Sequence, residues 1–146
     1  MVLVRTVTFY ENAEDDALKF AAVVSRCHGQ WVLCRDKKDD AWKIPGGNRR
    51  NGENIEETAR RELYEGLGAA GFRLLPVCVC GVREESGDET LGMLYFAEVQ
   101  EFFNTLGFEA GRIGCFGVLP ENLANPDVQP ALLERVSEMY GPGQTP

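Results

Sequence analysis

The chain reads GNRRNGENIEETARRELYEGLGA from Gly47 to Ala69, and this stretch predicts a turn, a capped helix and a group of acidic side chains. Asn54 is followed three residues later by Glu57, a spacing typical of the capping box at a helix N-terminus. Gly68 favours the left-handed conformation that ends many helices. Together these signals predict a helix from about Ile55 to Leu67.

One side of this helix is apolar. Aliphatic residues recur at every fourth position and form a narrow stripe along it. The stripe consists of Ile55, Ala59, Leu63 and Leu67. We therefore expect the helix to pack against another element of the fold.

Three of the glutamates in and beside the helix are candidates to share a metal. Glu62 and Glu65 project from neighbouring positions on one side, while Glu53 lies in the loop that enters the helix. Clustered carboxylates repel one another unless they share a cation, and hard oxygen ligands suit Mg²⁺ or Mn²⁺. The alternative interpretation is a solvent-exposed helix face, on which Arg61 pairs with Glu57 or Glu65.

The spacing of this stretch resembles the Nudix signature, G-x5-E-x7-R-E-U-x-E-E-x-G-U, in which U is a bulky aliphatic residue. Gly47, Glu53 and the run Arg61–Glu65 stand at the signature positions, and Trp42–Gly47 resembles the W-x-x-P-G-G segment that precedes it in the family. The resemblance implies an α/β protein with the Nudix fold, in which a mixed β-sheet is sandwiched between α-helices. It also implies Mg²⁺-dependent hydrolysis of nucleoside diphosphates linked to another group.

The resemblance further implies roles for individual residues. Glu62 and Glu65 are expected to bind Mg²⁺ together with the backbone carbonyl of Gly46, and Glu62 is also a candidate for the general base. Glu53 is expected to support the site, and Arg61 to orient the acids. In this scheme a water molecule, activated by the metal and a carboxylate, attacks a phosphorus atom of the diphosphate.

Two residues outside the helix also match family positions. Glu109 precedes a hydrophobic stretch, and the resemblance makes it either a further metal-binding carboxylate or an ordinary loop glutamate. Arg35 ends the strand before the W-x-x-P-G-G segment, where MutT-like members place a basic residue against the substrate phosphates. Lys37 and Lys38 are the alternatives for that contact.

One signature position departs from the pattern, because Gly66 stands where the second glutamate of the E-E pair belongs. Two functions therefore remain open. The favoured one is an active hydrolase, of the MutT-like type that clears 8-oxo-dGTP. The alternative is a catalytically impaired nucleotide-binding or regulatory module. A purely structural acidic domain is the third and least favoured possibility.

Asn122 and Asn125 resemble asparagines that read a purine edge in MutT-like enzymes, although we favour an ordinary turn there.

Length and composition indicate a single domain over residues 1–146, since 44% hydrophobic content supplies one core and no linker divides the chain. The net charge of −8 and pI near 4.7 argue against a nucleic-acid polymer as partner, because such partners require a basic patch. A divalent metal would overcome the repulsion between this acidic protein and a small diphosphate substrate. Some Nudix proteins are dimers, which leaves a homodimer open.

The sequence contains no recognisable signal for secretion or for insertion into a membrane. Met1 to Glu11 lacks the basic and apolar regions of a signal peptide, and no apolar run approaches the roughly 20 residues that span a bilayer. We expect a cytoplasmic protein with five buried, reduced cysteines, at Cys27, Cys34, Cys78, Cys80 and Cys115. No zinc site is expected, because His28 is the one histidine and no C-x-x-C pair occurs.

The remaining pattern predicts a mixed sheet between helices. Strands are expected at Val2–Tyr10, Ala17–Arg26, Trp31–Arg35, Phe72–Val82, Leu91–Val99 and Arg112–Leu119. A C-terminal helix is expected at Pro130–Met139, with Ala131, Leu132, Leu133 and Val136 facing inward.

Overall fold

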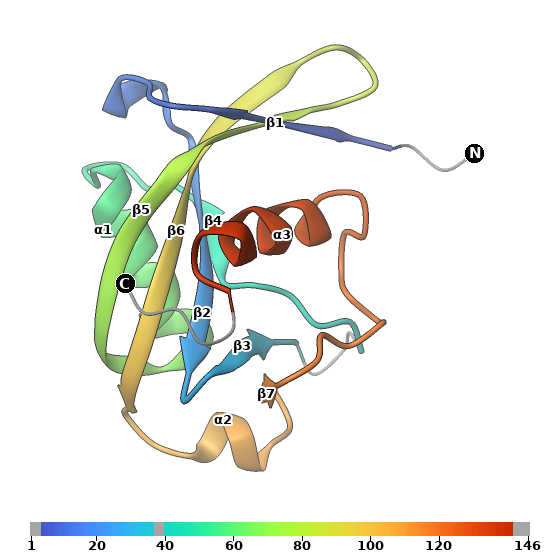
Figure 1. The fold of residues 1–146 in the computed structure, drawn as a ribbon. Coiled ribbons are helices and arrows are strands. Elements are labelled where there is room, and N and C mark those ends of the chain that lie inside the picture. The colour runs from blue at the N-terminus through green and yellow to red at the C-terminus, as the bar shows by residue number, and fades with distance from the viewer. Residues whose placement is uncertain (1–3, 37–39, 142–146) are drawn as a thin grey trace.

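The computed structural model describes residues 4–36 and 40–141. Within them, strands form one mixed sheet with the order β1-β5-β6-β2-β3-β7, and β4 pairs with β2 (Figure 1). All pairs are antiparallel except β2 with β6. The strands are β1 (Thr6–Tyr10), β2 (Phe20–Cys27), β3 (Gln30–Cys34), β4 (Gly46–Asn48), β5 (Ala69–Arg83), β6 (Glu89–Phe102) and β7 (Ile113–Phe116).

Helices cover both faces of the sheet. Helix α1 (Ile55–Leu67) lies on one face and α3 (Gln129–Met139) on the other, as Figure 1 shows. A short helix α2 (Leu106–Glu109) links β6 to β7, and a 3₁₀ turn η1 (Asp15–Ala17) precedes β2. The arrangement confirms the predicted α/β/α sandwich.

Helix α1 begins and ends where its sequence signals place it. The Asn54 side chain accepts a hydrogen bond from the Glu57 backbone N–H at 2.8 Å, and the Glu57 carboxylate accepts one from the Asn54 N–H at 2.9 Å. Gly68 ends the helix in the left-handed region, with φ 67°. The predicted apolar stripe is buried along its whole length: Ile55, Ala59, Leu63 and Leu67. This helix is therefore fixed at both ends and along one side.

Alternate side chains of β2 pack into two separate hydrophobic cores. Ala21 and Val23 belong to the core beneath α1, whereas Ala22 and Val24 belong to the core beneath α3. Such alternation is the period-two geometry of a strand buried on both faces. Leu132, Leu133 and Val136 of α3 are buried as expected, but Ala131 is only partly buried.

Several predicted boundaries shift. The strand expected from Ala17 begins at Phe20, because Asp15–Ala17 forms a 3₁₀ turn. The long hairpin of β5 and β6 extends beyond the predicted strands and takes up register shifts, one of them beside Pro76. A proline cannot donate to the ladder, so it belongs at such an irregularity. Val2 lies outside the described residues.

The cysteines follow the prediction with one exception. Cys27, Cys34, Cys78 and Cys80 are buried and free, whereas Cys115 is exposed on the edge strand β7, so its predicted burial is wrong. Burial raises the pKa of Cys34 to about 11 and that of Cys80 to about 12, which keeps both thiols protonated. His28 is exposed in the β2–β3 turn.

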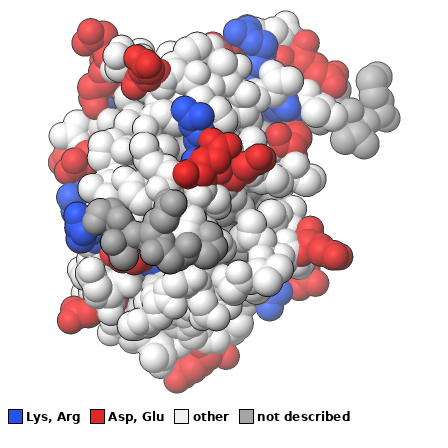
Figure 2. Space-filling view, viewed as in Figure 1, with Lys and Arg blue, Asp and Glu red and all other residues white. Residues whose placement is uncertain are grey.

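The surface seen in Figure 2 carries acidic residues in several separate groups, with lysines and arginines between them. This distribution is what a net charge of −8 leads one to expect. No helix among residues 4–36 and 40–141 is both long and apolar enough to cross a membrane.

Candidate active site

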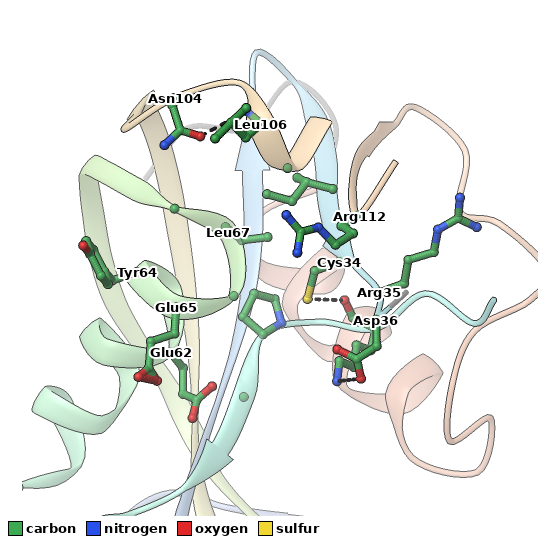
Figure 3. Close-up of a pocket in the computed structure, with 17 residues that line it drawn as sticks. Cys34, Arg35, Asp36, Glu62, Tyr64, Glu65, Leu67, Asn104, Leu106 and Arg112 are labelled. Carbon is green, nitrogen blue, oxygen red and sulfur yellow. Dashed lines mark hydrogen bonds and ion pairs between the residues drawn. The ribbon is translucent and has the colours of Figure 1, made fainter. Parts of the chain in front are cut away.

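A cavity of about 480 Å³ lies beside the C-terminal half of α1 (Figure 3). Its lining comes from α1, the segment between β3 and β4, and the segment around α2 and β7. The residues with polar side chains that line it are Cys34, Arg35, Asp36, Lys43, Glu62, Tyr64, Glu65, Asn104 and Arg112. Segments far apart in the sequence therefore share one concave surface.

The α1 wall of the cavity is acidic. Glu62 and Glu65 both line it, as does Gly46 at the start of β4. A Cβ atom at Gly47 would overlap the Glu62 carboxylate, so a side chain at this position would displace the carboxylate from its place beside β4. The structure thus brings together three of the four residues that the Nudix resemblance implies for a metal, namely Gly46, Glu62 and Glu65.

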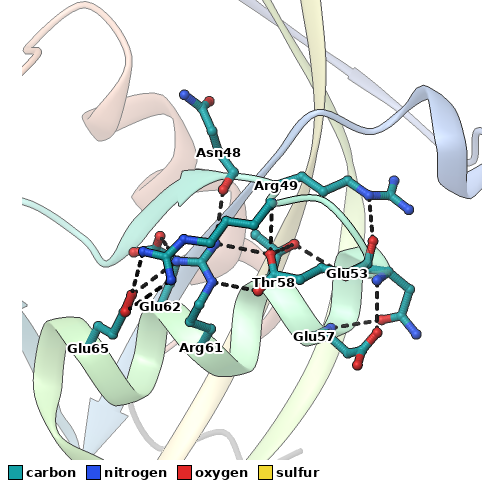
Figure 4. Close-up of polar contacts among 10 residues, drawn as sticks. Asn48, Arg49, Glu53, Glu57, Thr58, Arg61, Glu62 and Glu65 are labelled. Carbon is teal, nitrogen blue, oxygen red and sulfur yellow. Dashed lines mark hydrogen bonds and ion pairs between the residues drawn. The ribbon is translucent and has the colours of Figure 1, made fainter.

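Arg61 holds the acidic residues in place (Figure 4). Its Nε and Nη2 donate to the two carboxylate oxygens of Glu53 at 2.6 and 3.1 Å. Its Nη1 donates to Glu62 at 2.9 Å and to Glu65 at 3.1 Å, and Nη2 also donates to the Asn48 carbonyl at 2.9 Å. A guanidinium offers five donors in a rigid plane, which is how one side chain orients three carboxylates.

These contacts keep Glu53 ionised. Hydrogen bonds from Arg61 and from the Arg50 backbone lower the pKa of Glu53 from 4.5 to about 2. The same contacts also stabilise the charged form of Arg61. Hydrogen bonds to Glu53 and then to Glu65 and Glu62 raise the pKa of the Arg61 guanidinium. Glu53 does not line the cavity of about 480 Å³, so it acts on that cavity through Arg61.

The donors on the α1 wall suit a hard divalent cation, because they are carboxylate and carbonyl oxygens. Within the described parts of the chain, no three acidic, histidine or cysteine side chains converge in a form ready to hold a metal. Glu65 is instead shared between Arg61 and Arg50, whose nitrogens lie 3.1 to 3.4 Å from its oxygens. A cation bound here would therefore compete with arginine and depend on water for further ligands.

The glycine at position 66 leaves the cavity with fewer carboxylates than the family signature provides. Gly66 lines the cavity, and a Cβ atom there would lie 3.4 Å from Pro45 Cβ and 3.9 Å from Cys34 Sγ. These are ordinary contact distances, so a side chain at this position would fit and point toward the segment between β3 and β4. The site lacks a carboxylate where the family signature provides one.

The wall opposite α1 is basic. Arg112, Lys43 and Arg35 line it, and Lys43 Nζ lies 3.4 Å from the Asp36 carboxylate. In Figure 3 the Arg112 guanidinium points into the cavity, whereas that of Arg35 points away. Arg112 could not be identified from the sequence, because a lone arginine before a short strand matches no motif. Lys37 and Lys38 lie outside the described residues.

Glu109 lies at the end of α2 and is exposed. Its carboxylate accepts a hydrogen bond from the Thr105 hydroxyl at 2.8 Å, and it is not part of the cavity lining. The structure therefore does not bring Glu109 together with Glu62 and Glu65. Its role as an additional metal ligand stays a prediction.

The chain is similar in sequence to known proteins. A family model described as the NUDIX domain matches residues 16–113, which include α1 and most of the sheet. The chain is also 30% identical over 121 residues to the putative 8-oxo-dGTP diphosphatase YtkD of Bacillus subtilis (strain 168). That alignment covers 81% of this chain and 74% of the relative.

Solved structures share the fold. A mutant of the Bacillus subtilis pyrophosphohydrolase BsRppH superposes with a TM-score of 0.71 and 25% identity, over 95% of this chain and 98% of that one. A MutT NUDIX hydrolase from Burkholderia pseudomallei gives a TM-score of 0.58 with 23% identity, over 80% and 95% of the two chains. The second similarity supports the fold alone.

Proposed function

This chain belongs to the Nudix family of pyrophosphohydrolases, and on that premise we propose that it hydrolyses, with Mg²⁺ or Mn²⁺, a nucleoside diphosphate linked to another group. The observation that carries the proposal is a single cavity with Glu62 and Glu65 on one wall and arginine on the other. Acidic residues suit a divalent cation, and the basic wall suits the phosphates that the cation accompanies.

In the proposed reaction a water molecule attacks a phosphorus atom, and the bond to the bridging oxygen breaks. A divalent cation, when bound, lowers the pKa of a coordinated water molecule and stabilises negative charge on phosphate oxygens. Glu62 and Glu65 would hold that cation together with the Gly46 carbonyl. A carboxylate oxygen of Glu62 would accept the proton of the attacking water, and Arg61 keeps Glu62 and Glu65 in position through its hydrogen bonds.

The substrate we propose is a nucleoside triphosphate of the MutT-like type, with 8-oxo-dGTP as the first candidate. The support is the name of the relative YtkD, a putative 8-oxo-dGTP diphosphatase. The test is a panel of nucleotides that includes 8-oxo-dGTP, dGTP and nucleoside diphosphate sugars, incubated with and without Mg²⁺. Release of pyrophosphate or phosphate that depends on Mg²⁺ would support hydrolysis, and the preferred nucleotide would identify the substrate.

A second candidate follows from Gly66, which leaves the site one carboxylate short of the family signature. In that case the chain is a nucleotide-binding or regulatory module without turnover. Thermal stabilisation by a nucleotide and Mg²⁺, in the absence of any product, would favour this candidate over the hydrolase. A sample that shows neither stabilisation nor turnover with any nucleotide would contradict both.

A further inference from the structure

Arg35 occupies the position from which the Nudix resemblance predicts a contact with substrate phosphates, but its guanidinium contacts other groups of the protein. Its centre lies 4.2 Å from the centroid of the Trp42 ring, and its Nη1 lies 3.2 Å from Asp40. Its Nε donates to the Gly111 carbonyl at 2.8 Å. Figure 3 shows this side chain pointing out of the cavity.

The same arginine fixes the turn before β7. Besides the bond from Nε to Gly111, the backbone N–H of Arg35 donates to the Arg112 carbonyl at 2.8 Å. The Arg112 N–H in turn donates to the Gly107 carbonyl at 2.8 Å. Gly111 adopts φ 72°, a left-handed conformation that glycine reaches without strain. Arg35 therefore holds the backbone from which Arg112 projects.

Arg112 is the cation that this turn presents to the cavity. Its side chain makes no ion pair or hydrogen bond with any residue in 4–36 and 40–141, although it lines the same cavity as Glu62 and Glu65. By contrast, Lys43 on the same wall pairs with Asp36. Among the described residues, the positive charge of Arg112 therefore has no carboxylate partner, and it lies in the same cavity as the acidic wall.

We propose that Arg112 binds a phosphate group of the substrate and that Arg35 is a positioning residue, which acts by holding the turn at Gly111 and Arg112. A guanidinium matches phosphate with two parallel hydrogen bonds, and Arg112 has its donors available for them. This inference rests on the proposed function, because it assumes that the substrate carries phosphate groups into this cavity.

The first experiment tests the Arg112 contact with inorganic pyrophosphate in the presence of Mg²⁺, measured by isothermal titration calorimetry. Arg112→Gln is expected to weaken binding by about 10- to 100-fold, which is the effect of losing a hydrogen bond from a charged donor. KM for the best nucleotide of the panel should rise by a similar factor. Arg112→Lys should fall between the two, since lysine keeps the charge and loses the second parallel bond.

The matched control is Arg73→Gln on β5. Arg73 is exposed, lies outside the cavity lining and has no ion pair within the described residues, so the variant removes the same charge elsewhere. We expect its pyrophosphate affinity and KM to match the wild type. Equal weakening in both variants would show an effect of net charge and would overturn the assignment of Arg112.

The second experiment separates the roles of the two arginines with a double-mutant cycle. If Arg35 positions Arg112, Arg35→Gln should weaken pyrophosphate binding, and Arg35→Lys should not rescue it, because lysine cannot reproduce the planar contacts. The double variant should then bind no more weakly than Arg112→Gln. Losses that multiply, with rescue by Arg35→Lys, would show instead that Arg35 contacts phosphate directly.

The outcomes also distinguish this inference from the proposed function. If Arg112→Gln weakens pyrophosphate binding while the wild type hydrolyses no nucleotide, the phosphate contact stands and the hydrolase assignment falls. If nucleotides are hydrolysed with an unchanged KM in Arg112→Gln, the contact falls and the hydrolase assignment stands.

Discussion

The Arg61 guanidinium donates to both carboxylate oxygens of Glu53, at 2.6 and 3.1 Å, and its remaining nitrogen, Nη1, donates to both Glu62 and Glu65. Glu53 therefore controls the geometry of two acids that it does not contact. The pair is also largely shielded from water, with side chains 15% and 17% exposed. An ion pair with two parallel hydrogen bonds has a single favourable geometry, so it orients as well as neutralises.

Glu53 should make stability depend on pH at the acidic end. Its pKa is lowered from 4.5 to about 2 in the folded protein, so its stabilising contribution is present above about pH 4.5 and is lost as the pH falls toward 2. Glu53→Gln should reduce the slope of unfolding free energy against pH in that interval, measured by urea denaturation. Some slope should remain from Asp127, whose pKa is lowered to about 2 by hydrogen bonds from Arg5. Identical slopes in variant and wild type would contradict the prediction.

Glu62→Gln should lower turnover by about 10²–10⁴-fold, the range expected for loss of general acid–base catalysis, with further loss if the metal is released. The amide has nearly the same volume, so the melting temperature should change little. Steady-state kinetics and thermal unfolding test both points. Glu56→Gln is the control on the same helix, because Glu56 pairs with Arg60 and does not line the cavity. Near-wild-type turnover of Glu62→Gln, with the same metal requirement, would refute the proposed site.

Gly66→Glu should lower the Mg²⁺ concentration needed for half-maximal activity, since it restores a carboxylate beside Glu62 and Glu65. The space exists, because a Cβ atom at position 66 meets Pro45 and Cys34 at ordinary contact distances. Replacing a helical glycine should also stabilise the protein by about 0.5–1 kcal/mol.

The control for this prediction is Gly66→Ala, which removes the glycine without adding a carboxylate. A Mg²⁺ titration of activity and a melting curve should show the gain in stability in the alanine variant and the shift in metal midpoint in the glutamate variant alone. If the midpoint does not fall with glutamate, position 66 does not face a bound metal.

Arg50→Gln should tighten metal binding slightly. Arg50 lies 3.3 Å from the Glu65 carboxylate, and removing it frees an acid for the cation. The pair is exposed, and such pairs are worth at most about 1 kcal/mol, so the midpoint of a Mn²⁺ titration should fall by no more than about fivefold. Arg60→Gln, which removes an equal charge from a pair with Glu56, should leave the midpoint in place. Weaker binding in Arg50→Gln would show that Arg50 supports the site.

The sequence predicts α1 to the residue, because its signals are local: a capping box, a stripe with helical spacing and a terminal glycine. Strand β4 could not be predicted from local sequence, since Gly46, Gly47 and Asn48 have little strand propensity. These residues are extended only because they pair with β2. Local sequence also placed Glu62 and Glu65 on one side of the helix, and both line the cavity.

The basic wall shows the limit of local sequence most clearly. Arg35 and Arg112 are far apart in the chain, and their roles depend on the direction of each side chain. Trp42 and the Gly111 carbonyl decide that direction for Arg35, and neither contact follows from the residues beside it. The resemblance in sequence therefore predicted a basic residue at the cavity and identified Arg35, but it did not identify Arg112.

Because Arg61 lies among the acids of α1, the protein carries its own counter-ion. Loss of a metal would not leave bare negative charges facing one another, so folding and metal occupancy should be nearly independent. We expect a chelator to abolish activity while leaving the melting temperature within about 2 °C, since removing a weakly held cation costs little stability. Such a protein would stay folded when the cation is scarce and would regain activity when the cation is added back. The cation concentration would then set the rate of the reaction and not the amount of folded protein.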